Sequence, residues 1–122
     1  MSTLTRAYED YLEAVHILSK RKETLKSVDI ASFLGVSKAA VSKTIKELQE
    51  LGYLEEGKYH TPELTAKGLK VAQEVYGRHT LLKDFIISLG VSPEIAEIDG
   101  CKIEHVLSKE TLDAIKKKLE KK

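Results

Sequence analysis

Two short helical patterns joined by a glycine constrain the fold of this chain more than any other feature. They lie in SVDIASFLGVSKAAVSKTIKELQELGYL, residues 27–54. The first pattern predicts a helix over 27–34, which Gly35 can end in a left-handed conformation without steric cost. Ser37 is a good N-cap for a second helix over 38–51. Because the connection is so short, the two helices are expected to cross as a helix-turn-helix unit.

The residues after this unit indicate a small β-hairpin. They read YLEEGKYHTPELT over 53–65, where Gly57 separates two short segments and Pro62 prevents a helix. Ala31 is small where the two helices cross, and Val41 would pack the second helix onto the first. A helix-turn-helix followed by a hairpin is a winged helix-turn-helix, which predicts binding to double-stranded DNA.

The N-terminal end of the second helix carries the residues that we expect to enter the major groove. Three lysines and no acid lie within 37–46. Alanines allow a close approach, serines can reach phosphate or base edges, and lysines neutralise phosphate. A solvated helix face is the competing interpretation, but Glu47 and Glu50 come only after this end. The predicted DNA-binding residues are Ser37, Lys38, Ala39, Ala40, Ser42, Lys43 and Lys46.

The second half of the chain predicts three further helices. Thr65 can cap a long helix that ends at Gly90. Ser92 can cap a helix that reaches about residue 106, and Ser108 can cap the last one. The apolar residues of the long helix recur every three or four positions and predict one continuous buried seam: Leu69, Ala72, Tyr76, His79, Leu82, Ile86 and Leu89.

Composition fits a soluble, mainly α protein in two parts. Of 122 residues, 32% are charged and 42% hydrophobic, and no apolar run approaches the roughly 18 residues of a membrane span. We expect a winged helix-turn-helix domain over 1–65 and a helical domain over 66–122. The stretch MSTLTRAYEDYLEA lacks the apolar core of an export signal, and one cysteine cannot form an internal disulfide. These features predict a cytoplasmic location.

Three potential metal ligands lie close together in IDGCKIEHVLSKE, residues 98–110. At positions i, i+3 and i+4 of a helix, Cys101, Glu104 and His105 would share one face. Thiolate, carboxylate and imidazole are ligands of transition metals. Cys101 and His105 also resemble a nucleophile and its base, but the sequence offers no third orienting group and no glycine-rich anion loop, so we do not expect an enzyme.

Other candidate ligands are distant in sequence. Asp10 and Glu13 lie three residues apart in a helical pattern over 5–20, and His79 occupies the seam of the long helix. Each has an ordinary explanation by itself, as a solvated pair of acids or a hydrogen-bonded core histidine. A metal site therefore requires that the fold brings them together with Cys101.

The chain resembles the metal-dependent repressors of the diphtheria toxin repressor and manganese transport regulator family. Five stretches carry the resemblance, in order over 8–120: YEDYLEAVHIL, DIASFLGVSKAAVSKTIKEL, GYLEE…LTAKG, RHTLLKDFI and CKIEHVLS. Asp10 and Glu13 match the manganese-type acids, whereas Cys101 matches an iron-type cysteine that manganese-type members replace with glutamate. The resemblance implies a helical dimerisation lobe after the winged helix and these metal ligands: Asp10, Glu13, His79, Cys101, Glu104 and His105.

The implied ligand set is a hybrid of the two branches. Lys83 stands where iron-type members have an acidic ligand of an ancillary site, and Glu97 stands where that site has a histidine, so we do not expect the ancillary site. Carboxylates suit Mn²⁺, whereas the thiolate favours Fe²⁺, and other divalent metals should bind in vitro in the Irving–Williams order. One ion or a bridged pair would both fit six ligands.

The resemblance implies a homodimeric repressor of metal-uptake genes that binds palindromic operator DNA, without a small-molecule substrate and without a membrane. An ion held by both lobes would tie them together and set the separation of the two reading helices in the dimer. The alternative is a winged-helix regulator whose DNA binding does not depend on metal.

Overall fold

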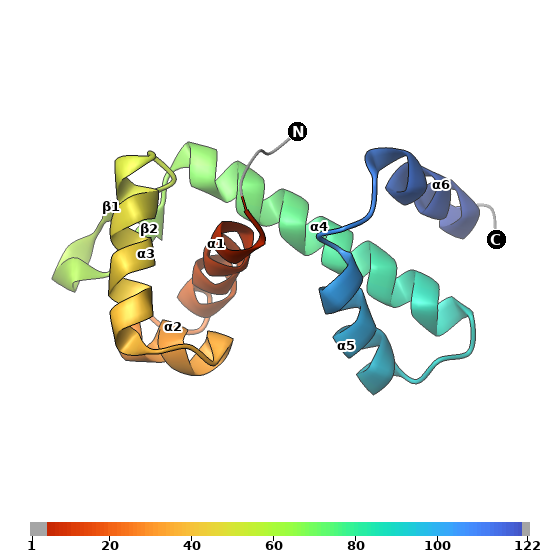
Figure 1. Ribbon diagram of the computed structural model, residues 1–122, viewed down its shortest axis with the longest axis horizontal. Helices are drawn as coiled ribbons and strands as arrows, with labels where there is room; N and C mark the ends of the chain where they lie inside the picture. Colours follow the sequence, from red (N-terminus) through yellow and green to blue (C-terminus); the bar gives the residue numbers. More distant parts are fainter. Residues whose placement is uncertain (1–4, 121–122) are drawn as a thin grey trace. The chain divides into compact units, whose positions relative to one another are not determined.

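The computed structural model describes residues 5–120 (Figure 1). It confirms the mainly α fold with a winged helix-turn-helix and one small hairpin. The described chain divides within a long helix, between Gln73 and Glu74, into two compact units. Its elements are α1 Arg6–Ser19, α2 Ser27–Leu34, α3 Lys38–Glu50, β1 Leu54–Glu56, a 3-10 turn Lys58–His60, β2 Pro62–Leu64, α4 Ala66–Ser88, α5 Pro93–Ile103 and α6 Lys109–Glu120.

The first unit is built on the contacts among α1, α2 and α3. Gly35 ends α2 with φ +71°, and the Ser37 hydroxyl accepts a hydrogen bond of 3.0 Å from the Ala40 N–H, as predicted for the turn and the cap. Ala31 and Val41 are buried where the helices cross. The fully buried side chains of this core include Leu12, Val15, Ile30 and Leu48.

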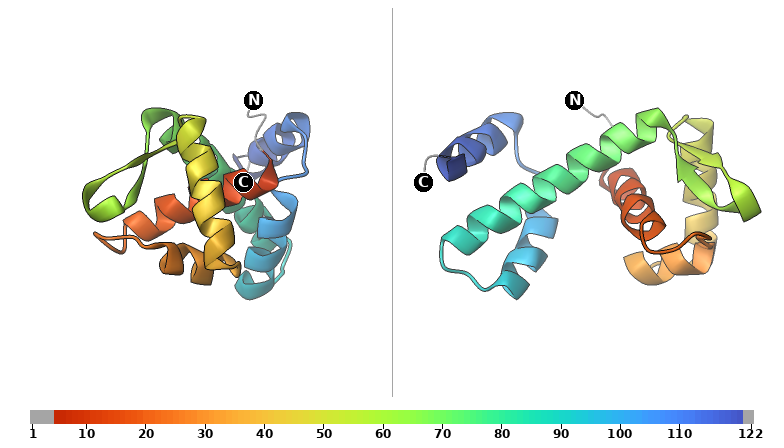
Figure 2. Two further views of the ribbon diagram at one scale, coloured as in Figure 1. Left: turned by 60° about the vertical axis from the view of Figure 1, so that its left-hand side comes forward. Right: turned by 180° about the vertical axis from the view of Figure 1, so that it is seen from behind.

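The hairpin lies against α1 and α3 of this unit. Strand β1 pairs antiparallel with β2, and Figure 2 shows the pair projecting beside α3. Pro62 is the first residue of β2 and pairs with Glu56 next to the turn, where its missing N–H removes little from the ladder. Leu54, opposite Leu64, is buried and joins the hairpin to the core.

The start of α4 is fixed to this hairpin. The Thr65 hydroxyl accepts from the Gly68 N–H at 3.1 Å and donates to the Gly52 carbonyl at 2.7 Å, so Thr65 is the predicted cap. Gly68 faces Tyr53, and an added Cβ would lie 1.9 Å from the Tyr53 carbonyl oxygen. Only a glycine allows this close approach.

The second unit contains the end of α4 together with α5 and α6. Leu82 and Ala96 are fully buried between α4 and α5. Gly100 of α5 is also buried, and an added Cβ would lie 3.4 Å from the backbone nitrogen of Lys83. The two helices are therefore packed closely enough for short polar side chains to meet across them.

The predicted seam of α4 is wrong over part of its length. Leu69, Tyr76 and Leu89 are 38%, 45% and 66% exposed. Val71 and Val75 are buried instead, next to the fully buried Ala72 and Leu82 of the prediction. The physical reason is that α4 belongs to two units, and each unit covers only its own portion of the helix. A strict repeat along the whole helix does not follow from such packing.

None of the helices within the described residues is long and apolar enough to cross a membrane.

Candidate metal centre and DNA-reading helix

Three of the predicted ligands meet in the second unit. His79 comes from α4, Cys101 from α5 and Glu104 from the position directly after α5. One donor atom of each lies within 4.8 Å of the others. This group joins a thiol, an imidazole and a carboxylate at one point, which is a donor set that divalent transition metals accept.

The Glu104 carboxyl is the most unusual part of this group. Its side chain is fully buried, and neither oxygen makes a hydrogen bond within the described residues. Two imidazoles face the same oxygen, Oε1: His79 Nδ1 at 3.7 Å and His105 Nε2 at 3.4 Å. Buried carboxylates are costly unless a hydrogen bond, a cation or a metal compensates the charge.

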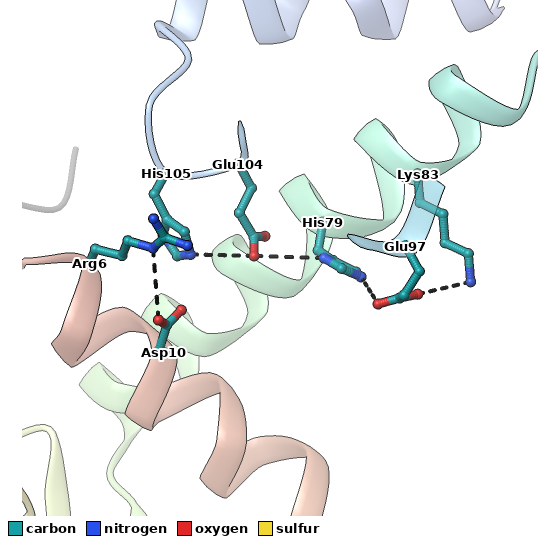
Figure 3. A network of polar contacts seen from close by, with 7 residues as sticks. All are labelled: Arg6, Asp10, His79, Lys83, Glu97, Glu104 and His105. Carbon is teal, nitrogen blue, oxygen red and sulfur yellow. Dashed lines mark hydrogen bonds and ion pairs between the residues drawn. The ribbon is translucent and has the colours of Figure 1, made fainter. Parts of the chain in front are cut away.

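His79 has a different neighbour on each side of its ring (Figure 3). Its Nε2 contacts a carboxylate oxygen of Glu97, while Nδ1 faces Glu104. Glu104, followed by Glu97, raises the pKa of His79 to about 9, although burial acts in the opposite direction. A metal ion that binds this imidazole must therefore displace a proton at neutral pH.

Glu97 is held in turn by Lys83. The Lys83 ammonium lies 3.0 Å from the second oxygen of Glu97, and this contact, followed by His79, lowers the pKa of Glu97. The sequence marked both residues as departures from the iron-type pattern, but it did not predict their contact. They lie on different helices, and no local spacing could have revealed the pair.

The end of α5 corrects the expected geometry of the ligands. The helix ends at Ile103 and not at about residue 106, because Glu104 is its C-cap. Cys101 remains one turn before Glu104, with an exposed side chain, but His105 lies in the turn that follows. His105 thus reaches Glu104 from outside the helical face that the i, i+4 spacing predicted. Its side chain is almost completely buried there.

The two remaining predicted ligands lie in the first unit. Asp10 and Glu13 are on α1, three residues apart. Glu13 is buried, and Asp10 is half-buried with Oδ2 4.0 Å from the Arg6 guanidinium. The fold places both acids at helical spacing, and their participation in a metal site stays a prediction.

The predicted DNA-reading residues form an open surface on the first unit. Ala40 is half-buried, and the other six residues of the prediction, from Ser37 to Lys46, are exposed. One link that the sequence did not predict supports this helix: the Tyr8 hydroxyl of α1 donates to Glu47 of α3 at 2.9 Å. This contact raises the pKa of Tyr8.

Comparison with known proteins gives a family match for each half of the chain. The family model "Iron dependent repressor, N-terminal DNA binding domain" matches residues 3–61, and "Iron dependent repressor, metal binding and dimerisation domain" matches 65–122. The chain is 42% identical to the transcriptional regulator MntR of Escherichia coli over 88% of its own length and 70% of that protein.

Two further similarities extend this result. An HTH-type transcriptional regulator of Methanocaldococcus jannaschii is 32% identical, over 97% of this chain and 96% of that one. The structure of the manganese regulator SloR superposes with a TM-score of 0.81 and 29% identity, over 93% of this chain and 53% of SloR. The chain belongs to the diphtheria toxin repressor and manganese transport regulator family of metal-dependent transcriptional repressors, and it is not an enzyme.

Proposed function

We propose that this chain acts as a homodimer that binds palindromic operator DNA when its metal centre holds Fe²⁺ or Mn²⁺, and thereby represses genes for metal uptake. The observation that carries the proposal is the buried Glu104 carboxyl beside Cys101 and His79, with both of its oxygens unsatisfied within the described residues. Such a carboxylate needs a positive partner.

The residues present fit a divalent cation. His79 Nδ1 also makes no hydrogen bond within the described part of the chain. Once the imidazole has lost its proton, one of its nitrogens and the two carboxylate oxygens of Glu104 offer lone pairs close together. The Cys101 thiol completes a set of soft and hard donors. A bound cation would supply the charge that compensates Glu104, while the neutral imidazole and the thiolate would hold it in place.

Metal preference follows from the same donors. SloR is described as a manganese regulator, and most ligands of the proposed set are the carboxylates and imidazoles that Mn²⁺ accepts. Cys101 adds a thiolate, which is a softer donor. We therefore propose that the chain binds both metals with a preference for Fe²⁺, and that other divalent transition metals bind in vitro.

We further propose that Asp10, Glu13 and His105 complete the ligand set. Asp10 and Glu13 belong to the unit that carries the DNA-reading helix, whereas the other ligands belong to the second unit. Ligands shared in this way would make the arrangement of the two reading helices depend on the metal. Coupling of this kind is typically about 1–3 kcal/mol, or 5- to 150-fold in affinity.

Titration of operator candidates tests this function. We would measure fluorescence anisotropy of promoter DNA with Mn²⁺, with Fe²⁺ under anaerobic conditions, and with a chelator. We expect tight binding with either metal and at least fivefold weaker binding with the chelator. DNA binding that is equally tight under all three conditions would instead support the winged-helix regulator that is not gated by metal.

A further inference from the structure

We propose that the Lys83 ammonium takes the place of a second metal ion in the second unit, so that the Nε2 side of His79 is closed to metal and Nδ1 alone serves as its ligand. The inference rests on the metal centre proposed above. It concerns three residues, His79, Glu97 and Lys83, which form a continuous chain of polar contacts in Figure 3.

The two carboxylate oxygens of Glu97 are both in use. Oε2 contacts His79 Nε2, and Oε1 lies 3.0 Å from the Lys83 ammonium. A neutral imidazole carries its proton on one nitrogen, and a carboxylate at Nε2 holds that proton there. The lone pair of Nδ1 is then directed to the side of Glu104, whose Oε1 is 3.7 Å away. Glu97 is thus a positioning residue for His79.

The packing of α5 on α4 explains why Lys83 can do this. His79 and Lys83 are one turn apart in α4, so their side chains leave the helix on the same side. Gly100 lets α5 lie close to this part of α4, and Glu97, about one turn earlier in α5, reaches both side chains. His79 Nε2 and the Glu97 carboxylate could both bind a metal ion. The third group beside them is the Lys83 ammonium, which is itself a cation.

The charge of Lys83 and its lack of a lone pair both exclude a metal ion from the Nε2 side of His79. A protonated lysine has no lone pair to donate, and its charge repels a metal ion. It also neutralises Glu97, which therefore does not require a metal. The arrangement fixes the orientation of His79 without a second ion, and we expect metal binding in the second unit only on the Nδ1 side.

Replacing Lys83 by an acid tests the inference. Lys83→Glu would place a third metal ligand beside Glu97 and His79 Nε2. Lys102→Glu is the matched control, because Lys102 is an exposed lysine of α5 and the charge change is the same. The full chain is titrated with Co²⁺ and with Mn²⁺ by calorimetry, and the Co²⁺ absorption spectrum is followed in parallel. We expect Lys83→Glu to bind one more ion per chain than the wild type, and Lys102→Glu to bind the same number.

A second pair of variants tests the positioning of His79. Lys83→Met removes the cation that holds Glu97 in place, so Glu97 should orient His79 less well. Binding of the first ion should then weaken by about 10- to 100-fold, as it does when an outer partner of a ligand is lost. Lys83→Arg keeps the charge and should restore the affinity. Melting of the metal-free proteins shows whether each variant is folded.

The possible failures are distinguishable. A wild-type chain that binds no Co²⁺ or Mn²⁺ would overturn both the proposed function and this inference. If the wild type binds metal but folded Lys83→Glu gains no ion, or Lys83→Met retains the wild-type affinity, the inference fails and the proposed function remains.

Discussion

At the scale of single residues, the second unit contains a fully buried carboxyl group. Among the described residues, Glu104 Oε1 lies 3.4 Å from His105 Nε2 and 3.7 Å from His79 Nδ1. In the metal-free chain a protonated His79 supplies part of the missing positive charge, which is why its pKa is raised. A metal ion and a proton therefore compete for the same imidazole.

The raised pKa predicts how the stability of the metal-free chain depends on pH. A histidine whose folded pKa is about 9, against 6.5 when unfolded, contributes stability that is complete below pH 6.5 and is lost as the pH rises through 9. We expect the free energy of unfolding to fall by up to about 3 kcal/mol across this window. Urea unfolding with a chelator, at several pH values, measures it. His79→Gln should remove most of the fall, and an equal fall in both proteins would contradict the assignment.

The role of Cys101 is predicted through metal preference. Cys101→Asp exchanges a soft donor for a hard one, so Fe²⁺ and Co²⁺ should lose affinity relative to Mn²⁺. Because aspartate is shorter than the glutamate of manganese-type members, the affinity for every metal can fall, and the ratio is the quantity to compare. Thiolate ligation of Co²⁺ should also give near-ultraviolet charge-transfer absorption that the variant lacks. No such band in the wild type, together with an unchanged ratio, would show that Cys101 is not a ligand.

At the scale of elements, α4 contains two glycines in opposite surroundings. Gly68 faces the hairpin, where an added Cβ would meet the Tyr53 carbonyl oxygen at 1.9 Å. At Gly77, no atom of the described residues outside the neighbouring helix backbone lies within 4 Å of the corresponding position. The first glycine is required by packing, and the second only weakens the helix.

Alanine at each position should therefore have opposite effects. Gly68→Ala forces backbone to move at the junction of hairpin and helix, and we expect a loss of about 3 kcal/mol. Gly77→Ala should raise the free energy of unfolding by about 0.5–1 kcal/mol, since alanine is the better helix former. Denaturant unfolding of the metal-free proteins measures both. A Gly68→Ala variant as stable as wild type would show that the Tyr53 backbone does not lie against the start of α4 in this position.

The exposed lysines of α3 predict the salt dependence of DNA binding. Lys38→Ala or Lys43→Ala should weaken binding and reduce the slope of log affinity against log salt by about 0.9 for each phosphate that the variant no longer neutralises. Both residues are exposed near the N-terminal end of the helix. Lys109→Ala, an exposed lysine of α6, is the control and should leave the slope unchanged. Unchanged affinity and slope in both α3 variants would mean that another element enters the groove.

Elements with local signals were predictable from the sequence, and contacts between elements were not. Ser37 and Thr65 were recognised as caps, and Gly35 as a turn, because each satisfies its backbone within a few residues. The apolar periodicity predicted α4, but it did not predict which of its side chains are buried. Burial depends on the two units that share the helix, because each unit covers a different portion of it. The contact between Lys83 and Glu97 depends on how α5 packs on α4. Helical spacing identified Cys101, Glu104 and His105 as candidate ligands, and the family resemblance joined His79 to them.

At the scale of the whole molecule, the second unit carries large apolar side chains that are exposed in a single chain. Among the described residues they are Tyr76, Ile87, Leu89, Ile95, Ile98 and Val106. Exposed apolar side chains mark an interface with another protein where they form a contiguous patch. This part of the chain matches a metal-binding and dimerisation domain, which indicates that the partner is a second copy of the chain. Leu82, a member of the predicted seam, is fully buried within the unit and is not available.

This surface predicts a dimer that single charges disrupt. Light scattering at micromolar concentration should give twice the mass of one chain. Leu89 and Ile98 are 66% and 50% exposed, and either one changed to Glu should weaken the dimer at least tenfold, because a two-fold interface contains each residue twice and an apolar side chain contributes about 1.5–3 kcal/mol when buried. Val28→Glu is the matched control, since Val28 is similarly exposed in the first unit. A wild type that stays monomeric with and without metal would refute the dimer, and a Val28→Glu effect equal to the others would place the interface elsewhere.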